Sequence, residues 1–183
     1  MEFSLEFIKV AQSVILEPGV QGIWPLFFVS FVNDVIGIFP FALVLAGQLL
    51  FLETAFTLSF VAKLLVFVAL PVGLGSSLGS FPLYGLAYFG GKPAIDKFQK
   101  YLRFSWADVE RVNQTFKGVW YDEVIFLLLR STPVLPSFPI DVAAGILRMP
   151  FWPFLVLTTV GSIIRMMLTL LVVGISMHTL AQF

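Results

Sequence analysis

Five charged side chains lie within the long apolar stretches of the sequence: Asp34, Lys63, Arg130, Asp141 and Arg165. A charge at the centre of a lipid bilayer costs about 2.5–3.5 kcal/mol on insertion scales, so it persists mainly where it is paired or faces water. Charges at this depth are typical of substrate and ion pathways. A guanidinium group can bind phosphate through two parallel hydrogen bonds, which suits the anionic headgroup of a lipid. The candidate transport residues are therefore Arg130, Asp34, Asp141, Arg165 and the neighbouring Asn33.

Each charge also has a purely structural interpretation, which the sequence leaves open. Arg130 and Asp141 could form an ion pair that only locks the local fold, and the ammonium group of Lys63 could extend to the membrane surface. Arg148 and Glu53 are typical of charges at the boundaries of apolar segments. Arg165 lies well within the last apolar segment, which favours a paired or pathway role.

The composition is that of a membrane protein. Hydrophobic residues make up 58% of the chain and charged residues 12%, whereas about 25% of residues are charged in soluble domains. Eleven basic and eleven acidic side chains give a net charge of zero, so no overall field attracts nucleic acid. The absence of cysteine excludes disulfides, thiolate catalysis and zinc-thiolate sites. The first residues lack the basic segment and cleavage site of a signal peptide, so we expect them to be retained.

Two apolar segments are interrupted near their middle by residues that break a membrane helix. The first, residues 20–52, contains Asn33, Asp34, Gly37 and Pro40, and the second, residues 120–149, contains Arg130, Pro133, Pro136, Pro139 and Asp141. Proline removes a backbone donor and clashes with the preceding turn, and a broken backbone at membrane depth must be buried in protein or line a wet cavity. We therefore predict two re-entrant hairpins, shaped by these prolines, with Gly145 allowing close packing. If their turns meet, both carboxylates and the guanidinium group come together.

The remaining segments are predicted to be spanning or surface helices. Residues 54–72, 74–90 and 151–175 have the length and apolar composition of spanning helices, with Pro71 to Gly73 separating the first two. Residues 2–16 and part of the polar stretch 92–119 have the spacing of amphipathic helices on the membrane surface.

The expected fold class is an all-α integral membrane protein, with a single domain over residues 1–183. It contains two re-entrant hairpins, about three spanning helices and two amphipathic interfacial helices. The order amphipathic helix, broken hairpin, spanning helix occurs at 2–72 and again at 93–175, which indicates an internal structural repeat. Residues 92–117 hold six of the eleven basic side chains, so this loop is predicted to face the cytoplasm from the cytoplasmic (plasma) membrane.

One short motif is typical of hydrolases. Gly75-Ser76-Ser77-Leu78-Gly79 matches the Gly-x-Ser-x-Gly pattern of a nucleophile elbow, and His178 is the single histidine. The elbow requires a strand before the serine, however, and this stretch is apolar and begins a predicted helix. Gly75 and Gly79 also have the small-x-x-x-small spacing that lets membrane helices approach closely. We therefore predict helix packing here and no enzyme activity.

Longer motifs lie in the second half of the chain. They are Leu78-Gly79, Tyr84-Gly85, Tyr88-Phe89-Gly90-Gly91, Lys117-Gly118, Arg130-Ser131-Thr132-Pro133-Val134-Leu135-Pro136 and Ala144-Gly145-Ile146-Leu147-Arg148-Met149, followed by Phe154 and Gly161. With these motifs, residues 20–175 resemble the DedA family, also called SNARE-associated or VTT-domain proteins. The resemblance implies two re-entrant hairpins that meet in the membrane. It also implies translocation of lipids, either scrambling of phospholipids or return of polyprenyl phosphate carriers such as undecaprenyl phosphate.

The resemblance carries over to individual residues of the two hairpins. By position, Arg130 corresponds to the family's hairpin arginine, and Asn33 and Asp34 fall where the first hairpin usually has a glutamate. Pro136 stands where a second arginine is usual in bacterial members, and apolar residues 41–42 replace a second hairpin acid. Some members are described as dependent on the proton-motive force. In this chain Asp34 and Asp141 would have to carry such coupling.

Three functions are compatible with the sequence. In the first, a transporter passes the headgroup of a lipid or lipid phosphate between the hairpins, with Arg130 binding the phosphate and Asp34 and Asp141 tuning its release. The second is a proton-coupled or ion-coupled exchanger of small solutes with Asp34 and Asp141 as proton sites. The third is a membrane assembly factor without transport activity. The expected partners are membrane lipids; a proton or sodium ion as driving ion and a homo-oligomer are left open, and no catalytic residue, metal site or cofactor is expected.

Overall fold

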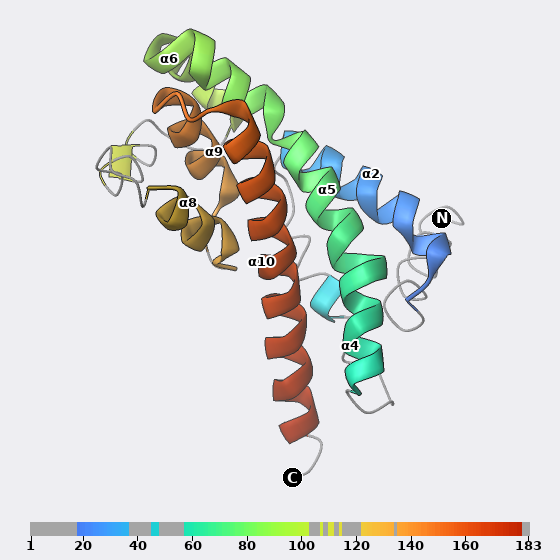
Figure 1. Cartoon of the computed structure of the whole chain (residues 1–183). Coiled ribbons are helices and arrows are strands. Elements are labelled where there is room, and N and C mark those ends of the chain that lie inside the picture. Colours follow the sequence, from blue (N-terminus) through green and yellow to red (C-terminus); the bar gives the residue numbers. More distant parts are fainter. Residues whose placement is uncertain are drawn as a thin grey trace.

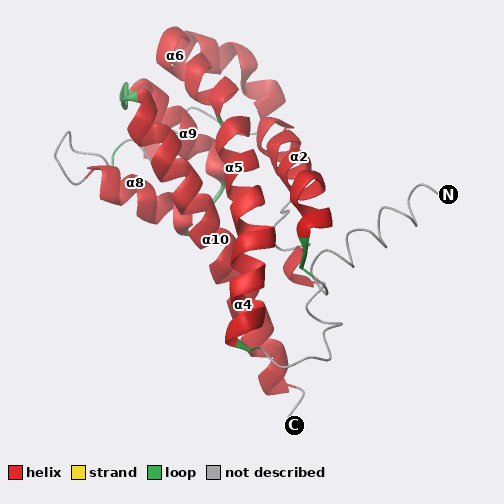
Figure 2. Ribbon diagram, turned by 45° about the vertical axis from the view of Figure 1, so that its right-hand side comes forward, coloured by secondary structure: helices red, strands yellow, loops and turns green. Residues whose placement is uncertain are grey.

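The computed structural model describes residues 18–36, 45–47, 57–102, 107, 110–111, 114, 122–133 and 135–180. Regular structure within these residues is entirely helical (Figure 1, Figure 2). The helices are α2 (Val20–Ile36), α4 (Leu58–Leu64), the π-helix η2 (Leu65–Ala69), α5 (Leu70–Gly79), α6 (Phe81–Leu102), α8 (Asp122–Ser131), α9 (Ser137–Ile146) and α10 (Phe151–Leu180). The predicted all-α class is therefore confirmed. Among the described residues, two segments, Leu58–Gly91 and Phe151–Val173, are long and apolar enough to cross a membrane.

The first of these segments is a single rod built from α4, η2, α5 and the first part of α6. The sequence predicted two spanning helices here, 54–72 and 74–90, divided at Pro71 to Gly73. That division was wrong, because the helix continues through Pro71 to Gly91. This region therefore forms one candidate span, not two.

A π-turn explains why Pro71 does not end the helix. The N–H of Leu70 donates to the carbonyl oxygen of Leu65, five residues earlier, in the wide turn of η2. In a regular helix the proline ring clashes with the carbonyl group four residues before it. A π-turn widens the backbone locally, and because it lies immediately before Pro71, the ring is accommodated without a break.

The rod bends where the apolar sequence ends. Gly91 has φ 55° and ψ −153°, which interrupts the regular helix inside α6. This region of backbone conformation is essentially restricted to glycine. The end of α6 covers the first part of the polar stretch 92–119, and most of the predicted surface helix, which was expected from Ser105 to Gly118, lies outside the described residues. The predicted helix 2–16 also lies outside them, as do Gly37, Pro40 and Glu53.

Helix α2 packs closely along α5, in the same chain direction. The hydroxyl of Ser30 donates to the carbonyl oxygen of Val72 at 2.8 Å, and further along Asp34 contacts Ser76. A Cβ atom on Gly79 would lie 2.5 Å from the carbonyl oxygen of Phe31, and Gly75 faces the backbone of α2 in the same way. The predicted role of these two glycines in helix packing is confirmed. The stretch is helical throughout, so it has no strand–turn–helix elbow.

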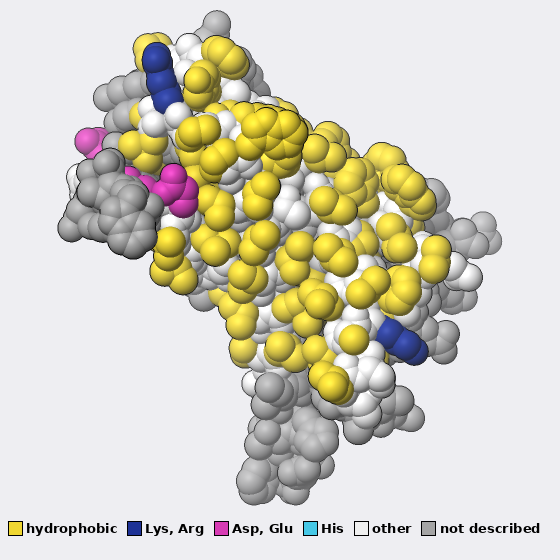
Figure 3. All heavy atoms as spheres, in the orientation of Figure 1, with side chains coloured by type: hydrophobic (Ala, Val, Ile, Leu, Met, Phe, Trp, Pro, Cys, Tyr) yellow, Lys and Arg dark blue, Asp and Glu magenta, His cyan; other side chains and the backbone are white. Residues whose placement is uncertain are grey.

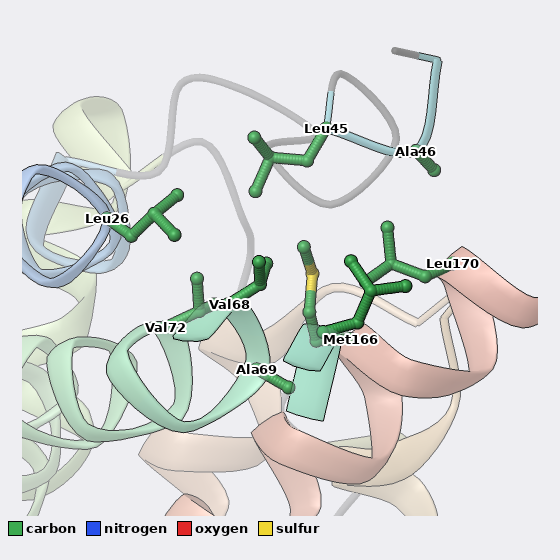
Figure 4. Packing of buried hydrophobic residues seen from close by; sticks show 9 residues of the cluster. Leu26, Leu45, Ala46, Val68, Ala69, Val72, Met166 and Leu170 are labelled. Carbon is green, nitrogen blue, oxygen red and sulfur yellow. The ribbon is translucent and has the colours of Figure 1, made fainter. Parts of the chain in front are cut away.

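An apolar cluster joins α2, η2, α10 and the short helical segment 45–47 (Figure 4). Its fully buried members include Ala46, Val68 and Leu170. Residues 45–47 therefore lie beside η2, the part of the rod that precedes α5. Helix α2, in contrast, ends at Ile36, past the contact between Asp34 and Ser76 of α5. Residues 45–47 thus lie nearer the Leu58 end of the rod than the end of α2 does.

The second broken segment forms two helices, α8 and α9, separated at residues 132–136. Helix α8 follows α10 in the same chain direction, since Phe126 contacts Phe154 and Arg130 contacts Gly161. Helix α9 packs on α6, where a Cβ atom on Gly145 would lie 2.5 Å from the carbonyl oxygen of Tyr84. Because α10 and the rod run in opposite directions, α8 and α9 are antiparallel.

The prolines of this segment act differently from one another. Pro133 lies in the turn between the helices, and Pro136 is the residue that precedes α9, with extended backbone. Pro139, which was predicted to break the chain like the other two, instead lies in the first turn of α9. The N–H groups of a first helical turn have no partner within the helix, so proline is tolerated there.

The turn between α9 and α10 is held by backbone and side-chain bonds. Arg148 adopts φ 53°, and the N–H of Met149 donates to the carbonyl oxygen of Ala144, as in a Schellman cap. The hydroxyl of Tyr84 donates to the carbonyl oxygen of Met149 at 2.5 Å. The ring of Tyr84 stacks on that of Phe154 at 4.2 Å between centroids.

The outer surface is apolar over the faces of α10, α5 and α2 (Figure 3). Exposed large side chains include Trp24, Leu74, Trp152, Val156 and Val172. The Lys and Arg atoms visible in this view lie near opposite ends of the face (Figure 3). Such a surface suits hydrocarbon as the surrounding solvent.

Candidate transport site

Arg130 is the centre of a buried polar cluster. The whole Arg130 residue is 0% exposed. Nη1 donates to both carboxylate oxygens of Asp141 at 2.8 Å, and Nη2 donates to Ser80 at 2.8 Å, Ser76 at 3.1 Å and Asp34 at 3.3 Å. The structure thus brings together the guanidinium group and both carboxylates that the sequence singled out.

A serine network connects this cluster to α10. The hydroxyl of Ser76 donates to the carboxylate of Asp34 and lies 3.1 Å from the hydroxyl of Ser162. Ser80 donates to the carbonyl oxygen of Ser76 at 3.0 Å, so its side chain links the end of α5 to Arg130. The sequence reasoning missed all three serines as site residues. The spacing of Ser76 and Ser80, one helical turn apart on one face, was the signal that could have identified two of them.

Gly161 provides the space for the Arg130 side chain. A Cβ atom at this position would lie 2.7 Å from Cγ and 2.9 Å from Cβ of Arg130. The aliphatic part of the arginine therefore lies directly on the backbone of α10. Gly161 is also adjacent to Ser162, so one turn of α10 contacts both the stem of Arg130 and its polar network.

The cluster lies at the middle of both apolar spans. Ser162 has eleven residues of the Phe151–Val173 span on each side, and Ser76 is near the midpoint of Leu58–Gly91. The carboxylates of Asp34 and Asp141 together carry two negative charges, whereas Arg130 supplies one positive charge. Arg165 interacts electrostatically with Arg130, Asp34 and Asp141, and its charge balances the set.

Arg165 also holds the proline turn between α8 and α9. Its guanidinium group donates to the carbonyl oxygens of Leu135 at 2.6 Å and Pro133 at 3.3 Å, and to the hydroxyl of Ser137 at 3.2 Å. A break in a membrane helix frees carbonyl groups that need donors. Arg165 supplies those donors from α10.

The other charged or polar residues singled out from the sequence lie elsewhere or at the margin. Asn33 precedes Asp34 in α2 and is half-buried. Lys63 is exposed on α4, and Arg148 is exposed at the end of α9. Within the described residues, no group of three or more histidine, cysteine, aspartate and glutamate side chains could hold a metal ion.

Some buried donors of the site have no partner among the described residues. They include Nε of Arg130 and the hydroxyls of Ser131 and Thr158. A buried polar group without a hydrogen bond costs about 1–3 kcal/mol, so such atoms commonly mark a place for water or ligand. Arg130 therefore has a spare donor on the edge that also carries Nη2.

These features define a helical membrane protein with a charge-paired polar centre between its helices. The VTT domain matches residues 41–174, and the chain belongs to the VTT-domain, or DedA, family. Undecaprenyl phosphate transporter A of Bacillus subtilis (strain 168) is 31% identical over 90 residues, which cover 49% of this chain and 44% of that protein. The match thus spans less than half of the relative's length. No solved structure matches the chain.

Proposed function

We propose that the protein moves a lipid phosphate between the two leaflets, with its headgroup at Arg130 and its tails in the surrounding lipid. The observation that carries the proposal is the fully buried guanidinium group at mid-span, with an unpartnered Nε. Family membership supports it, and so does the similarity to a transporter named for undecaprenyl phosphate. We place the protein in the cytoplasmic membrane with residues 92–117 facing the cytoplasm.

The helix directions support two opposed re-entrant hairpins. Helix α2 starts toward the Leu58 end of the rod and reaches the polar centre at Asp34. Residues 45–47 lie beside η2, again toward the Leu58 end. Helix α8 starts near the Phe151 end of α10 and follows α10 to the polar centre. Helix α9 then returns along α6 toward the end of the molecule from which α8 started. One crossing separates the two hairpins, so they open to opposite membrane faces. This arrangement gives the centre an approach from either leaflet, as alternating access requires.

The contacts of Arg130 indicate which carboxylate yields to the phosphate. The Asp34 side chain is 12% exposed and 3.3 Å from Nη2, whereas the Asp141 side chain is 1% exposed and 2.8 Å from Nη1. Arginine binds phosphate with two adjacent donors. The phosphate takes Nε and Nη2 and displaces Asp34, while Asp141 keeps Nη1 in place. The return of Asp34 then releases the phosphate.

The same geometry favours headgroup binding over proton exchange at Asp141. A proton there would neutralise a carboxylate whose two oxygens both accept from Nη1 of the buried Arg130. The guanidinium group would lose the charge of its shorter ion pair, and leaving a buried charge uncompensated costs about 3–5 kcal/mol. When the lipid phosphate displaces Asp34, in contrast, a negative group stays beside Arg130 at every stage, so the guanidinium charge remains compensated.

Transport in reconstituted vesicles tests the proposal. Vesicles would contain a fluorescent polyprenyl phosphate, a fluorescent phospholipid or a neutral lipid with matching chains, and a membrane-impermeant quencher would measure the fraction exposed. We expect protein-dependent movement of a phosphate-bearing lipid and none of the neutral one. Arg130→Lys keeps the charge but loses the paired donors, so we expect about a tenfold loss, equivalent to about 1.4 kcal/mol. Equal rates for wild type, Arg130→Lys and empty vesicles would rule the proposal out.

A further inference from the structure

Thr158 of α10 has a buried hydroxyl group that differs from those of its neighbours. The residue is 0% exposed, and its Oγ1 has no hydrogen-bond partner within the described residues. A threonine inside a helix can donate to the carbonyl oxygen four residues earlier. Thr159 and Thr169 of the same helix do so, at 2.8 Å each. The hydroxyl of Thr158 is therefore not satisfied by its own helix.

Two contacts between the rod and α10 fix the level of Thr158 in the molecule. The ring of Tyr84 stacks on that of Phe154, and the hydroxyl of Ser76 lies 3.1 Å from that of Ser162. On both helices these contacts are separated by about two turns. The helices are antiparallel, so the layer midway between the contacts contains Thr158 on the α10 side, on the same face as Phe154 and Ser162.

The rod residue of this layer is Ser80, which contacts Arg130. Nη2 of Arg130 donates to the hydroxyl of Ser80 at 2.8 Å. The aliphatic stem of Arg130 lies on Gly161, less than one turn from Thr158 along α10. Nε of Arg130 lies between that stem and Nη2, and it is also without a partner among the described residues. Two buried donors without partners thus occur at one level of the polar centre.

A phosphate monoester has the acceptors that these donors require. Under the proposed function, Nε and Nη2 of Arg130 take two of its three terminal oxygens. A phosphodiester has two such oxygens, so the arginine alone would engage both. We propose that Thr158 donates to the third oxygen and thereby selects lipid phosphate monoesters over diesters. The inference rests on the proposed function and assigns a specificity-determining residue to its site.

A structural role and a ligand role of Thr158 predict different effects of Thr158→Val. Valine keeps the branched shape and lacks the hydroxyl. A buried hydroxyl without a partner destabilises the fold, because its hydrogen bonds to water are lost and not replaced. The melting temperature of Thr158→Val should therefore be unchanged or higher than that of the wild type. Its discrimination between phosphates should nevertheless fall.

Two alkyl phosphates test the contact with the third oxygen. Monododecyl phosphate has three terminal oxygens, and its methyl ester has one of them blocked. Isothermal titration calorimetry in non-ionic detergent would measure the binding of each to the full chain. We expect Thr158→Val to lower the preference for the monoester about tenfold, equivalent to about 1.4 kcal/mol. The two ligands also differ in charge, but that effect is common to both proteins and cancels in the comparison.

Two variants provide matched controls. Thr169→Val removes a buried hydroxyl of α10 that already donates to the carbonyl oxygen of Arg165. Ser77→Ala removes another buried hydroxyl without a partner among the described residues, which lines the apolar hollow at Leu74. We expect the preference to change by less than about twofold in each.

The results separate the inference from the function on which it rests. An unchanged preference in Thr158→Val, with binding still weakened by Arg130→Lys, would overturn the role of Thr158 and leave the proposed function standing. An equal loss of preference in Ser77→Ala would overturn it as well. Wild-type protein that binds neither phosphate and moves no lipid phosphate in vesicles would count against the function itself, and against the inference with it.

Discussion

Nη1 of Arg130 donates to both carboxylate oxygens of Asp141 at 2.8 Å, across the proline turn that separates α8 from α9. The two residues belong to the same broken segment, so this pair closes the segment on itself. Asp34 reaches the same guanidinium group from α2, at 3.3 Å. The two carboxylates therefore share one cation unequally, and their removal should have unequal effects.

Asp141→Asn should destabilise the protein more than Asp34→Asn. Removing one partner of a buried ion pair costs about 3–5 kcal/mol, because the remaining charge is left uncompensated. Asp34→Asn removes a longer contact and keeps the Arg130–Asp141 pair, so we expect a loss closer to the value of one charged hydrogen bond, about 1.5–3 kcal/mol. Unfolding in detergent micelles would measure both. The opposite order of stabilities would contradict the assignment of Asp141 as the holding residue.

Gly161→Ala should displace Arg130. The new methyl group would lie 2.7 Å from Cγ of Arg130, and overpacking of this kind costs about 1–3 kcal/mol. Gly85→Ala is the matched control, since a Cβ atom there meets nothing within 4 Å. Melting temperature and lipid transport should both fall for Gly161→Ala and hold for Gly85→Ala. Equal behaviour of the two variants would show that the arginine stem tolerates displacement.

Arg165→Lys should loosen the turn between α8 and α9. The guanidinium group donates to Pro133, Leu135 and Ser137 at once, whereas an ammonium group is a single point with a different geometry. We expect a loss of about 1.5–3 kcal/mol, the value of a hydrogen bond to a charged group, and faster hydrogen exchange around residue 137. Arg148→Lys, at an exposed position, should change neither quantity, and a similar effect from it would argue against the capping role.

Tyr84→Phe should weaken the connection between α9 and α10. It removes the hydrogen bond to the carbonyl oxygen of Met149 and keeps the ring stacked on Phe154. The expected cost is about 1 kcal/mol, as for an ordinary hydrogen bond. Tyr88→Phe provides the comparison, because within the described part of the chain the Tyr88 hydroxyl makes no such hydrogen bond, while its ring also contacts Tyr84. Equal melting temperatures for both variants would contradict the prediction.

The sequence predicted the features that depend on residue type and missed those that depend on local geometry. Apolar composition predicted a helical membrane protein, and Pro133 and Pro136 predicted the break between α8 and α9. Charge at membrane depth selected Arg130, Asp34 and Asp141, which the structure places in contact. These inferences succeed because hydrocarbon penalises an unpaired charge or a broken backbone wherever it occurs.

Other features could not be read from residue types. Pro71 is followed by a glycine two residues later and looked like a helix end, but a π-turn beginning at Leu65 absorbs it. Ser76 and Ser80 were not selected as site residues, because a serine in a small-residue helix serves equally for close approach and for hydrogen bonding. Which role it takes depends on the helix that lies opposite, and that is a property of the tertiary structure.

The partners of Arg130 come from separate helices, with Asp34 on α2, Ser76 on α5 and Asp141 on α9. In a chain in which one of these helices has not yet docked, the guanidinium charge of Arg130 would be incompletely compensated in hydrocarbon, at a cost of several kcal/mol. Membrane insertion and helix docking are thereby coupled, since early intermediates are penalised until the last helix arrives. Burial of Arg130 at low cost therefore requires that α2, α5 and α9 have all docked around it.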